Sequence, residues 1–315
     1  MTKTRPAAYR RRDVLKAGAA AGVLLAAGRS WAATGADRGA LRLVFYTDVH
    51  ARVEWDTPLA LAKAAAAMNQ AKPDLVFAGG DLVTDGFQAA SVAEMAPRWD
   101  AYMAMHNAIE GEIHAAIGPH DMVAADPGDG SPAAADPRAE FRKRLGVPRT
   151  YYAFDALGYH FMILDSIRIS GDKYRFHGMI APAELAWLKQ DLARVPPGAP
   201  IVVVVHIPLL TAFYAATDGA TAAARPNRMI GNNVEVLEAF SGHNLHLVLQ
   251  GHMHAKELIR WRDTTFITGG ALSGKWWRGP WHGTDAGFNI ITLKDDHIEW
   301  DYVEYGWRAR RPVDE

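Results

Sequence analysis

Five short segments of the sequence carry histidine and aspartate side chains that could bind metal ions or transfer protons. Each segment follows an apolar run with the length of a buried strand. Ligands of open α/β sheets bind beyond the carboxyl ends of the strands, so side chains far apart in sequence can meet there. The segments are Tyr46-Thr47-Asp48-Val49-His50, Gly79-Gly80-Asp81, Gly118-Pro119-His120-Asp121, His206-Ile207-Pro208 and Gly251-His252-Met253-His254.

The chemistry open to these segments is limited by the residues that the chain lacks. The sequence has no cysteine, which excludes disulfides, thiolate metal sites and cysteine nucleophiles. Sets that mix carboxylate and imidazole groups suit Mn, Fe or Zn better than Mg or Ca. Only five of the 13 histidines lie in the segments. We expect the others to be structural or at the surface, and we expect Asp85 to cap a turn.

The order of the segments, Asp-x-His, Gly-Asp, Gly-x-His-Asp, His and Gly-His-x-His, resembles the calcineurin-like metallophosphoesterase superfamily. The resemblance extends over residues 41–305. It implies a four-layer α/β/β/α sandwich with antiparallel strands at its C-terminal end, and a hydrolase acting on phosphoric ester bonds. The stretch from Gly80 to Gly86, Gly-Asp-Leu-Val-Thr-Asp-Gly, resembles the bacterial branch that includes cyclic-nucleotide and glycerophosphodiester hydrolases. A phosphodiester substrate is therefore slightly favoured, and a phosphomonoester remains the alternative.

The resemblance also implies a centre of two divalent metals, Mn, Fe or Zn. Asp48, His50 and His254 would hold the first metal. His206 and His252 would hold the second, and Asp81 would bridge the two. Two metals about 3.5–4 Å apart can clamp phosphate oxygens and activate a hydroxide that attacks phosphorus.

The resemblance gives His120 a different role, in which it binds no metal. His120 would stand above the metals as general acid or transition-state stabiliser, and Asp121 would fix its orientation. Histidine suits this task because it can protonate a leaving alkoxide near pH 7.

Pro119 departs from the family pattern. The family usually has asparagine at this position, where its amide oxygen binds the second metal. We expect the second site to be one ligand short and weaker, unless Asp121, Asn232 or Asn233 replaces that oxygen. Pro119 is also the only support for a second hypothesis, a non-catalytic exported metal-binding module.

A tryptophan-rich segment near the C-terminus, residues 270–279, is the candidate substrate wall. The tryptophan rings would stack on a leaving group, and a cation would face phosphate. The alternative is a packed aromatic cluster with solvated charges. The candidate residues are Lys275, Trp276, Trp277 and Arg278. For Arg225 and Arg228, in the irregular stretch 211–233, a solvated loop is the preferred interpretation.

The elements that must position these residues follow an alternating pattern. A strand over 41–47, a helix from Thr57-Pro58 to about residue 70 and a strand over 75–78 predict a βαβ unit. Further helices are expected over 91–110 and 182–194. The β-branched run 201–205 is typical of a strand buried on both faces. Residues 266–268, 288–293 and 297–305 alternate like antiparallel strands.

The N-terminus reads as an export signal. Arg11-Arg12-Asp13-Val14-Leu15-Lys16 resembles the twin-arginine motif, and Ser30-Trp31-Ala32 has the form of a signal-peptidase site. The apolar run between them is about 12 residues long, which is too short for a stable membrane span. We expect a signal over 1–32, a flexible lead-in over 33–40 and one domain over 41–315. The partners would be the twin-arginine export machinery and a small phosphate ester, with the protein in the periplasm or secreted.

Net charge narrows the range of partners. The 315 residues carry a formal charge of -1, which provides no long-range attraction for nucleic acid or an anionic membrane. No nucleic-acid partner is expected.

Overall fold

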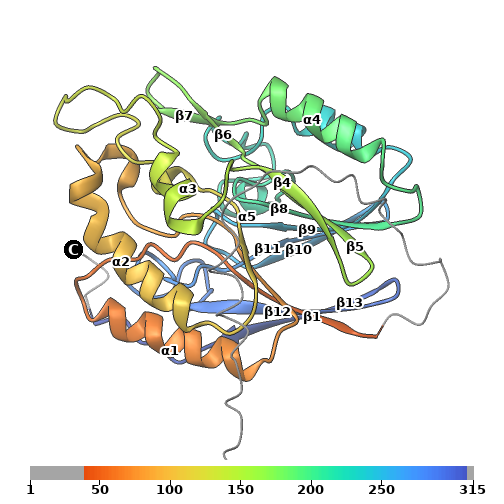
Figure 1. Ribbon diagram of the computed structural model, residues 1–315, viewed down its shortest axis with the longest axis horizontal. Helices are drawn as coiled ribbons and strands as arrows, with labels where there is room; N and C mark the ends of the chain where they lie inside the picture. The colour runs from red at the N-terminus through yellow and green to blue at the C-terminus, as the bar shows by residue number, and fades with distance from the viewer. Residues whose placement is uncertain (1–38, 311–315) are drawn as a thin grey trace, which may run out of the picture. The chain divides into compact units, whose positions relative to one another are not determined.

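Two facing sheets form the centre of the fold (Figure 1). The computed structural model describes residues 39–310, all of which belong to the compact unit Thr34–Glu315. The first sheet has the order β13 (His297–Glu304), β12 (Gly287–Lys294), β1 (Leu41–Tyr46), β2 (Leu75–Ala78) and β3 (Ile113–Ala115). The second has the order β10 (Glu257–Trp261), β11 (Thr264–Thr268), β9 (Asn244–Gln250), β8 (Pro200–Val205), β5 (Tyr159–Ile163) and β4 (Tyr152–Ala156). A hairpin pairs β6 (Ile167–Ile169) with β7 (Phe176–Gly178).

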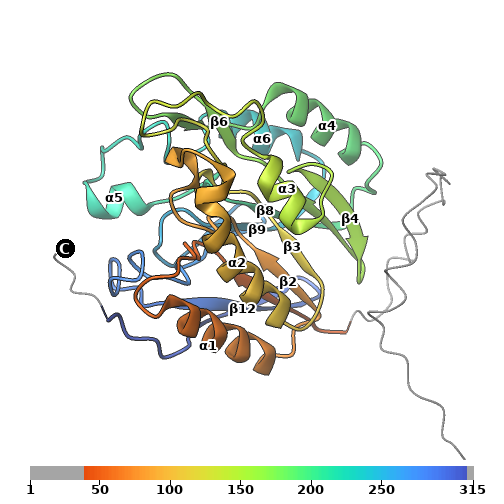
Figure 2. The same cartoon turned by 60° about the vertical axis from the view of Figure 1, so that its left-hand side comes forward.

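Helices cover the outer faces of both sheets, as Figures 1 and 2 show. On the first sheet, the hydroxyl of Tyr46 in β1 lies 3.1 Å from that of Tyr102 in α2. On the second sheet, His160 of β5 lies 2.8 Å from Asp191 of α4. The helices are α1 (Thr57–Gln70), α2 (Val92–Ala108), α3 (Ala139–Leu145), α4 (Pro182–Leu192), α5 (Phe213–Thr217) and α6 (Asn233–Ala239), with 3-10 turns η3 (Gly86–Gln88) and η4 (Pro119–Asp121). The expected α/β/β/α sandwich is confirmed.

Alternation of side chains along the strands builds the core between the sheets. Leu43 and Phe45 of β1 and Val202 and Val204 of β8 are fully buried in one apolar cluster. Successive residues of a strand point to opposite faces, so the residues between them point outward toward the helices. Every residue of β8 is buried, as its β-branched sequence predicts.

The C-terminal strands divide between the two sheets. β13 pairs with β12 and β12 with β1, both antiparallel. β11 is antiparallel to β10 but parallel to β9, so it is not purely the antiparallel strand that its alternation predicted. The return of β12 to β1 joins the end of the fold to its beginning.

The predicted signal, residues 1–32, and the lead-in up to residue 38 lie outside the described residues. Over residues 39–310, the structure contains no helix that is both long and apolar enough to cross a membrane.

Candidate metal centre

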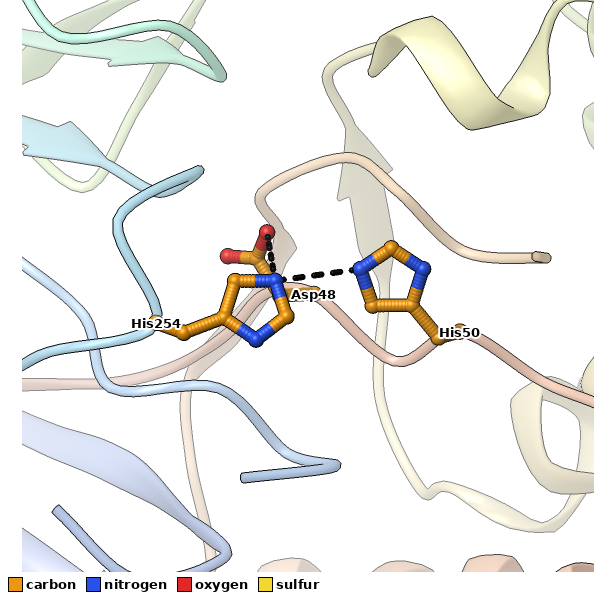
Figure 3. Close-up of side chains that lie close together, drawn as sticks. All are labelled: Asp48, His50 and His254. Carbon is orange, nitrogen blue, oxygen red and sulfur yellow. Dashed lines mark hydrogen bonds and ion pairs between the residues drawn. The ribbon is translucent and has the colours of Figure 1, made fainter. Parts of the chain in front are cut away.

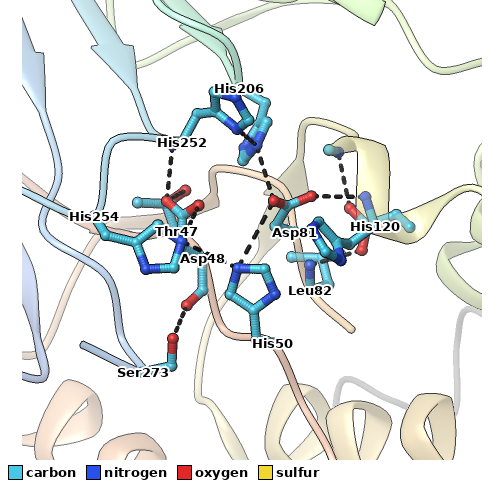
Figure 4. Close-up of polar contacts among 12 residues, drawn as sticks. Thr47, Asp48, His50, Asp81, Leu82, His120, His206, His252, His254 and Ser273 are labelled. Carbon is cyan, nitrogen blue, oxygen red and sulfur yellow. Dashed lines mark hydrogen bonds and ion pairs between the residues drawn. The ribbon is translucent and has the colours of Figure 1, made fainter. Parts of the chain in front are cut away.

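The six predicted metal ligands lie together at the carboxyl ends of four strands (Figure 4). Two of these strands, β1 and β2, are neighbours in the first sheet, and β8 and β9 are neighbours in the second. All six side chains are buried. The ligands are Asp48 and His50 after β1, Asp81 after β2, His206 after β8, and His252 and His254 after β9.

Asp48, His50 and His254 form the first cluster (Figure 3). Nε2 of His50 lies 3.1 Å from Nε2 of His254. The same nitrogen of His254 lies 3.3 Å from Oδ1 of Asp48. Oδ2 of Asp48 is held by the hydroxyl of Thr47 at 2.8 Å and the amide of His252 at 2.9 Å. The carboxylate is thus fixed with one oxygen facing the imidazoles.

Asp81, His206 and His252 form the second cluster. Nε2 of His206 lies 3.2 Å from Oδ2 of Asp81 and 3.1 Å from Nδ1 of His252. Oδ2 of Asp81 is also 3.8 Å from Nε2 of His50. Asp81 therefore stands between the two clusters, as a bridging ligand would.

Backbone carbonyls set the tautomers of three of these histidines. Because a carbonyl oxygen only accepts, the ring nitrogen that faces it must carry a proton. Nδ1 of His206 donates to Gly79, Nδ1 of His254 to Gly274, and Nε2 of His252 to Asn227. In the neutral rings, the lone pairs therefore lie on the nitrogens that face the two clusters. Such outer partners typically orient metal-binding imidazoles.

The donor set fits a divalent metal. Oδ1 of Asp48 is buried without a hydrogen-bond partner. Neighbouring imidazole nitrogens lie 3.1 Å apart in each cluster, close to the roughly 3.3 Å between two ligands of a tetrahedral ion with bonds of about 2.0 Å. Lone pairs at such distances repel one another unless a metal ion or a proton lies between them. The imidazole and carboxylate groups of the two clusters therefore fit divalent Mn, Fe or Zn.

A metal ligand must be a neutral imidazole or an ionised carboxylate. Burial and neighbouring charges give His50, His252 and Asp81 these states, but not His206. Burial lowers the pKa of His50 and of His252 well below the usual value, so both are neutral at pH 7. Burial opposes ionisation of Asp81, but the charges of His206 and His120 outweigh it and lower the Asp81 pKa. Burial would also lower the His206 pKa, but Asp81 raises it to about 9. His206 must lose a proton before it can bind a metal.

The backbone of the ligand loops adopts the left-handed conformation. This conformation costs a residue other than glycine about 1–3 kcal/mol and tends to occur at functional sites. Here it turns successive side chains of Asp-x-His and His-x-His toward the same centre. The residues are Asp48 (φ 52°), His50 (φ 46°), Asp81 (φ 52°), His252 (φ 69°) and His254 (φ 57°).

His120 lies beside the clusters, with its ring perpendicular to that of His50 at a centroid distance of 4.8 Å. Its ring is close enough to His50 and Asp81 to form a third group of potential ligands. However, Nδ1 of His120 accepts a hydrogen bond of 3.0 Å from the amide of Asp85. The proton of the neutral ring must then lie on Nε2. His120 is therefore arranged as a proton donor rather than as a ligand.

Asp121 has different partners from those expected. Its carboxylate accepts from the amides of Leu82 at 2.6 Å, Val83 at 3.1 Å and Gly118 at 2.8 Å. It fixes the turn that carries His120, whereas the amide of Asp85 orients the ring itself. Burial and the charge of Asp81 raise the pKa of Asp121 to about 8, although the hydrogen bonds from the amides of Gly118 and Val83 lower it.

The three residues considered as replacements for the missing asparagine are all engaged elsewhere. Asp121 binds backbone amides, as described. Asn232 exchanges two hydrogen bonds with the backbone of Ile180, and Asn233 donates to Leu209. None of the three conceivable substitutes is therefore directed at the second cluster by its hydrogen bonds. The loop instead brings Nη1 of Arg228 to 3.5 Å from Nε2 of His252, which its interpretation as a solvated loop did not predict.

The tryptophan pair is divided between two environments. Trp276 lies against the first cluster, 4.3 Å from the ring of His254 and 5.7 Å from that of His50. Trp277 is 2% exposed and donates from Nε1 to the carbonyl of His50 at 2.9 Å. Trp277 thus supports the site from the core, and the expectation that it stacks on substrate is wrong. Trp276 alone of the pair is placed for such contact.

The cations beside the tryptophan pair lie over other rings. Nζ of Lys275 is 5.4 Å from the ring of Trp281, and Cζ of Arg278 is 5.9 Å from that of Trp55. Their predicted contacts with substrate phosphate remain predictions.

The two-sheet α/β sandwich thus brings imidazole and carboxylate groups together at its strand ends, where they could hold metal ions. The family model described as calcineurin-like phosphoesterase matches residues 41–256, and the chain belongs to this family. The protein is accordingly a hydrolase of phosphoric ester bonds that uses divalent metals. No curated protein matches the chain.

Solved structures share the fold at low sequence identity. A dimetal phosphatase from Danio rerio is 16% identical with a TM-score of 0.61, covering 83% of this chain and 95% of its own. GAP50, the anchor in the inner membrane complex of Plasmodium, is 16% identical with a TM-score of 0.54, covering 86% of this chain and 87% of its own. A purple acid phosphatase from yellow lupin is 16% identical with a TM-score of 0.54, covering 84% and 52%. These likenesses show a common fold.

Proposed function

We propose that the protein hydrolyses phosphate esters, with phosphodiesters preferred, at a centre of two divalent metals, Mn, Fe or Zn. One observation carries the proposal: the amide of Asp85 keeps Nδ1 of His120 as an acceptor. A proton on Nε2 is available to a leaving oxygen only in that tautomer. A site built only to store metal has no need of a histidine arranged in this way. The preference for diesters rests on the resemblance of residues 80–86 to the phosphodiesterase branch.

The proposed roles of the residues follow from their geometry. When bound, the metals supply Lewis acidity toward phosphate oxygens and lower the pKa of a water molecule. His120 donates its Nε2 proton to the leaving oxygen as the P–O bond breaks and an oxygen from water joins phosphorus. Oδ1 of Asp81 accepts from the backbone amide of His120 at 2.9 Å, which fixes the donor relative to the ligands. Trp276 offers an aromatic face beside the first cluster.

Assays on paired substrates test this proposal. Protein loaded with Mn, Fe or Zn would be given bis(4-nitrophenyl) phosphate and 4-nitrophenyl phosphate, and kcat/KM would be measured for each. We expect turnover of both, with a higher kcat/KM for the diester. Negligible turnover of both with all three metals would refute the proposal.

Arg228 favours a phosphomonoesterase as the second candidate. Its guanidinium lies beside His252, and the part of the chain that the structure describes gives it no ion pair with a carboxylate. A monoester brings about two negative charges at neutral pH and would balance this cation better than a diester. A higher kcat/KM for the monoester in the same assay, lost in Arg228→Ala, would support this alternative.

We further propose that the twin-arginine machinery exports the protein to the periplasm or beyond. The support is the Arg11-Arg12 motif. Replacing both arginines by lysine, which keeps the charge, should retain the protein inside the cell. Unchanged export of this variant would contradict the proposal.

A further inference from the structure

Three arginines lie close together beside the metal centre, two of them over the ring of Trp55 and the third facing the carboxylate of Asp85. Cζ of Arg52 lies 4.0 Å from the centroid of Trp55, and Cζ of Arg278 lies 5.9 Å from it. Nη2 of Arg52 and Nη1 of Arg98 both face Oδ2 of Asp85, at 3.8 Å and 3.3 Å. We call Arg52, Arg98 and Arg278 the arginine cluster. They come from a strand end, a helix and a loop, so only the fold brings them together.

The positive charge of the arginine cluster is not fully compensated. Within residues 39–310, its ion pairs are with Glu54 and Asp85 only, and both carboxylates are about half exposed. The side chains of Arg52 and Arg98 are much less exposed, at 14% and 20%. An exposed carboxylate at such distances contributes little. Three cations therefore face two weak partners.

Donor groups in the cluster lack acceptors. Nε of Arg52 and Nε of Arg278 are buried and have no hydrogen-bond partner. Buried donors without acceptors and like charges in proximity both cost free energy. A bound anion would relieve both.

The cluster lies on the side of the metal centre that holds His120. Asp85 connects the two: its carboxylate faces Arg52 and Arg98, and its backbone amide donates to the ring of His120. Arg52 is two residues beyond His50, and Arg278 follows Trp277, whose indole binds the carbonyl of His50. A leaving group that receives its proton from His120 would thus extend toward these arginines.

We propose that the arginine cluster binds a second anionic group, a carboxylate or a phosphate, carried by the leaving part of the substrate. Guanidinium groups recognise both through paired N–H donors. The inference rests on the proposed function, because His120 defines the leaving side. The preferred substrates are then phosphate esters with an anionic alcohol rather than a neutral one.

Two diesters that differ by one carboxylate test this specificity. Methyl 4-nitrophenyl phosphate and methyl 3-carboxy-4-nitrophenyl phosphate would be compared by kcat/KM in metal-loaded protein. We expect about a tenfold preference for the carboxylated ester, the size of one hydrogen bond to a charged group. The preference should fall toward one in Arg52→Gln and in Arg278→Gln, and Arg52→Lys should retain part of it.

A matched control removes a distant arginine. Arg262 lies in the turn between β10 and β11, just before the start of β11. β11 runs parallel to β9, and its last residue, Thr268, pairs with Gln250 at the carboxyl end of β9, so Arg262 is at the opposite end of these strands from the metal ligands. Arg262→Gln should keep the tenfold preference, which separates a local contact from a change in net charge. Equal kcat/KM for the two esters in the wild type, or a preference that survives both Arg52→Gln and Arg278→Gln, would overturn the inference.

A binding experiment separates this inference from the proposed function. The probe is 5-hydroxy-2-nitrobenzoate, the alcohol released from the carboxylated ester, titrated calorimetrically into metal-loaded protein with 4-nitrophenol as reference. We expect about tenfold tighter binding of the carboxylated phenol, lost in Arg52→Gln and Arg278→Gln. Such binding without turnover of either ester would refute the proposed function and leave the cluster as an anion site. Turnover of both esters without this binding difference would refute the cluster alone.

Discussion

Trp277 donates a hydrogen bond of 2.9 Å from its indole nitrogen to the backbone carbonyl of His50. Trp277 is one of the largest fully enclosed side chains in the described part of the chain. The bond holds the strand end that carries two ligands of the first cluster. Trp277→Phe keeps most of the ring volume but leaves that carbonyl without its donor. We expect a loss of about 1–3 kcal/mol in the free energy of unfolding, measured by urea denaturation.

The neighbouring tryptophan provides the contrast. Trp276 is partly exposed, so Trp276→Phe should change the free energy of unfolding by less than Trp277→Phe does. Its effect should appear in KM, because its ring flanks the site. Equal losses of stability in the two variants would contradict the division of the pair.

His120→Asn should impair hydrolysis most for poor leaving groups. General acid catalysis contributes about 10²–10⁴-fold when the leaving oxygen needs a proton. We therefore expect a loss of about 100-fold or more in kcat with a diester that releases an alkyl alcohol, and a smaller loss with one that releases 4-nitrophenol. Stopped assays on a series of leaving alcohols would measure this slope.

A surface histidine serves as control for this series. His297 is strongly exposed, and His297→Asn should leave kcat unchanged for every alcohol. If His120→Asn reduced kcat equally for all leaving groups, His120 would stabilise the transition state without donating a proton.

Pro119→Asn should tighten the second metal. The variant restores an amide at the position where the family has one, and no replacement among Asp121, Asn232 and Asn233 competes for the place. An added ligand should improve the dissociation constant by about tenfold or more, measured by calorimetric titration of the metal-free protein with Mn. Pro148→Asn, in the exposed stretch after α3, controls for the loss of a proline. Identical Mn affinity in Pro119→Asn and wild type would refute a missing ligand.

Metal binding at the second cluster should release a proton below pH 9. Asp81 raises the pKa of His206 from its usual 6.5 to about 9, so a metal must displace the proton that His206 holds at neutral pH. Affinity should rise about tenfold per pH unit up to pH 9 and then level off. Calorimetry in buffers with different enthalpies of ionisation would count the proton.

The Asp81–His206 pair also determines how the free energy of unfolding of the metal-free protein changes with pH. A histidine with a raised pKa stabilises the fold most fully below pH 6.5, and this contribution is lost as the pH rises through about 9. His206→Asn should remove both this pH dependence and the released proton. A metal affinity in the wild type that does not vary between pH 6 and 9 would refute the proton displacement.

The sequence predicted the positions of the ligands better than their supports. Asp48, Asp81 and His206 follow recognisable strands, and their side-chain types reveal the metal chemistry. The carbonyls of Gly79, Asn227 and Gly274 that set the tautomers could not be predicted, because every residue has a carbonyl. The amide of Asp85 is hidden for the same reason.

The directions of side chains on neighbouring residues were the hardest feature to predict. Trp276 and Trp277 have identical side chains and both adopt the left-handed backbone, φ 48° and φ 70°, yet only Trp277 enters the core. The resemblance assigned Asp121 to the orientation of His120, whereas its oxygens accept from the amides of Leu82, Val83 and Gly118. Sequence adjacency did not show where either side chain points.

The placement of the ligands on both sheets has a mechanical consequence. The first cluster takes Asp48 and His50 from one sheet and His254 from the other, and the second joins Asp81 to His206 and His252 in the same way. Each metal would thus crosslink the two sheets. This chain has no cysteine, so disulfides cannot provide such a link. Removing the metals with a chelator should then raise amide hydrogen exchange at the carboxyl ends of β1 and β9 together. The metals of the reaction would in that case also stabilise the packing of the two sheets.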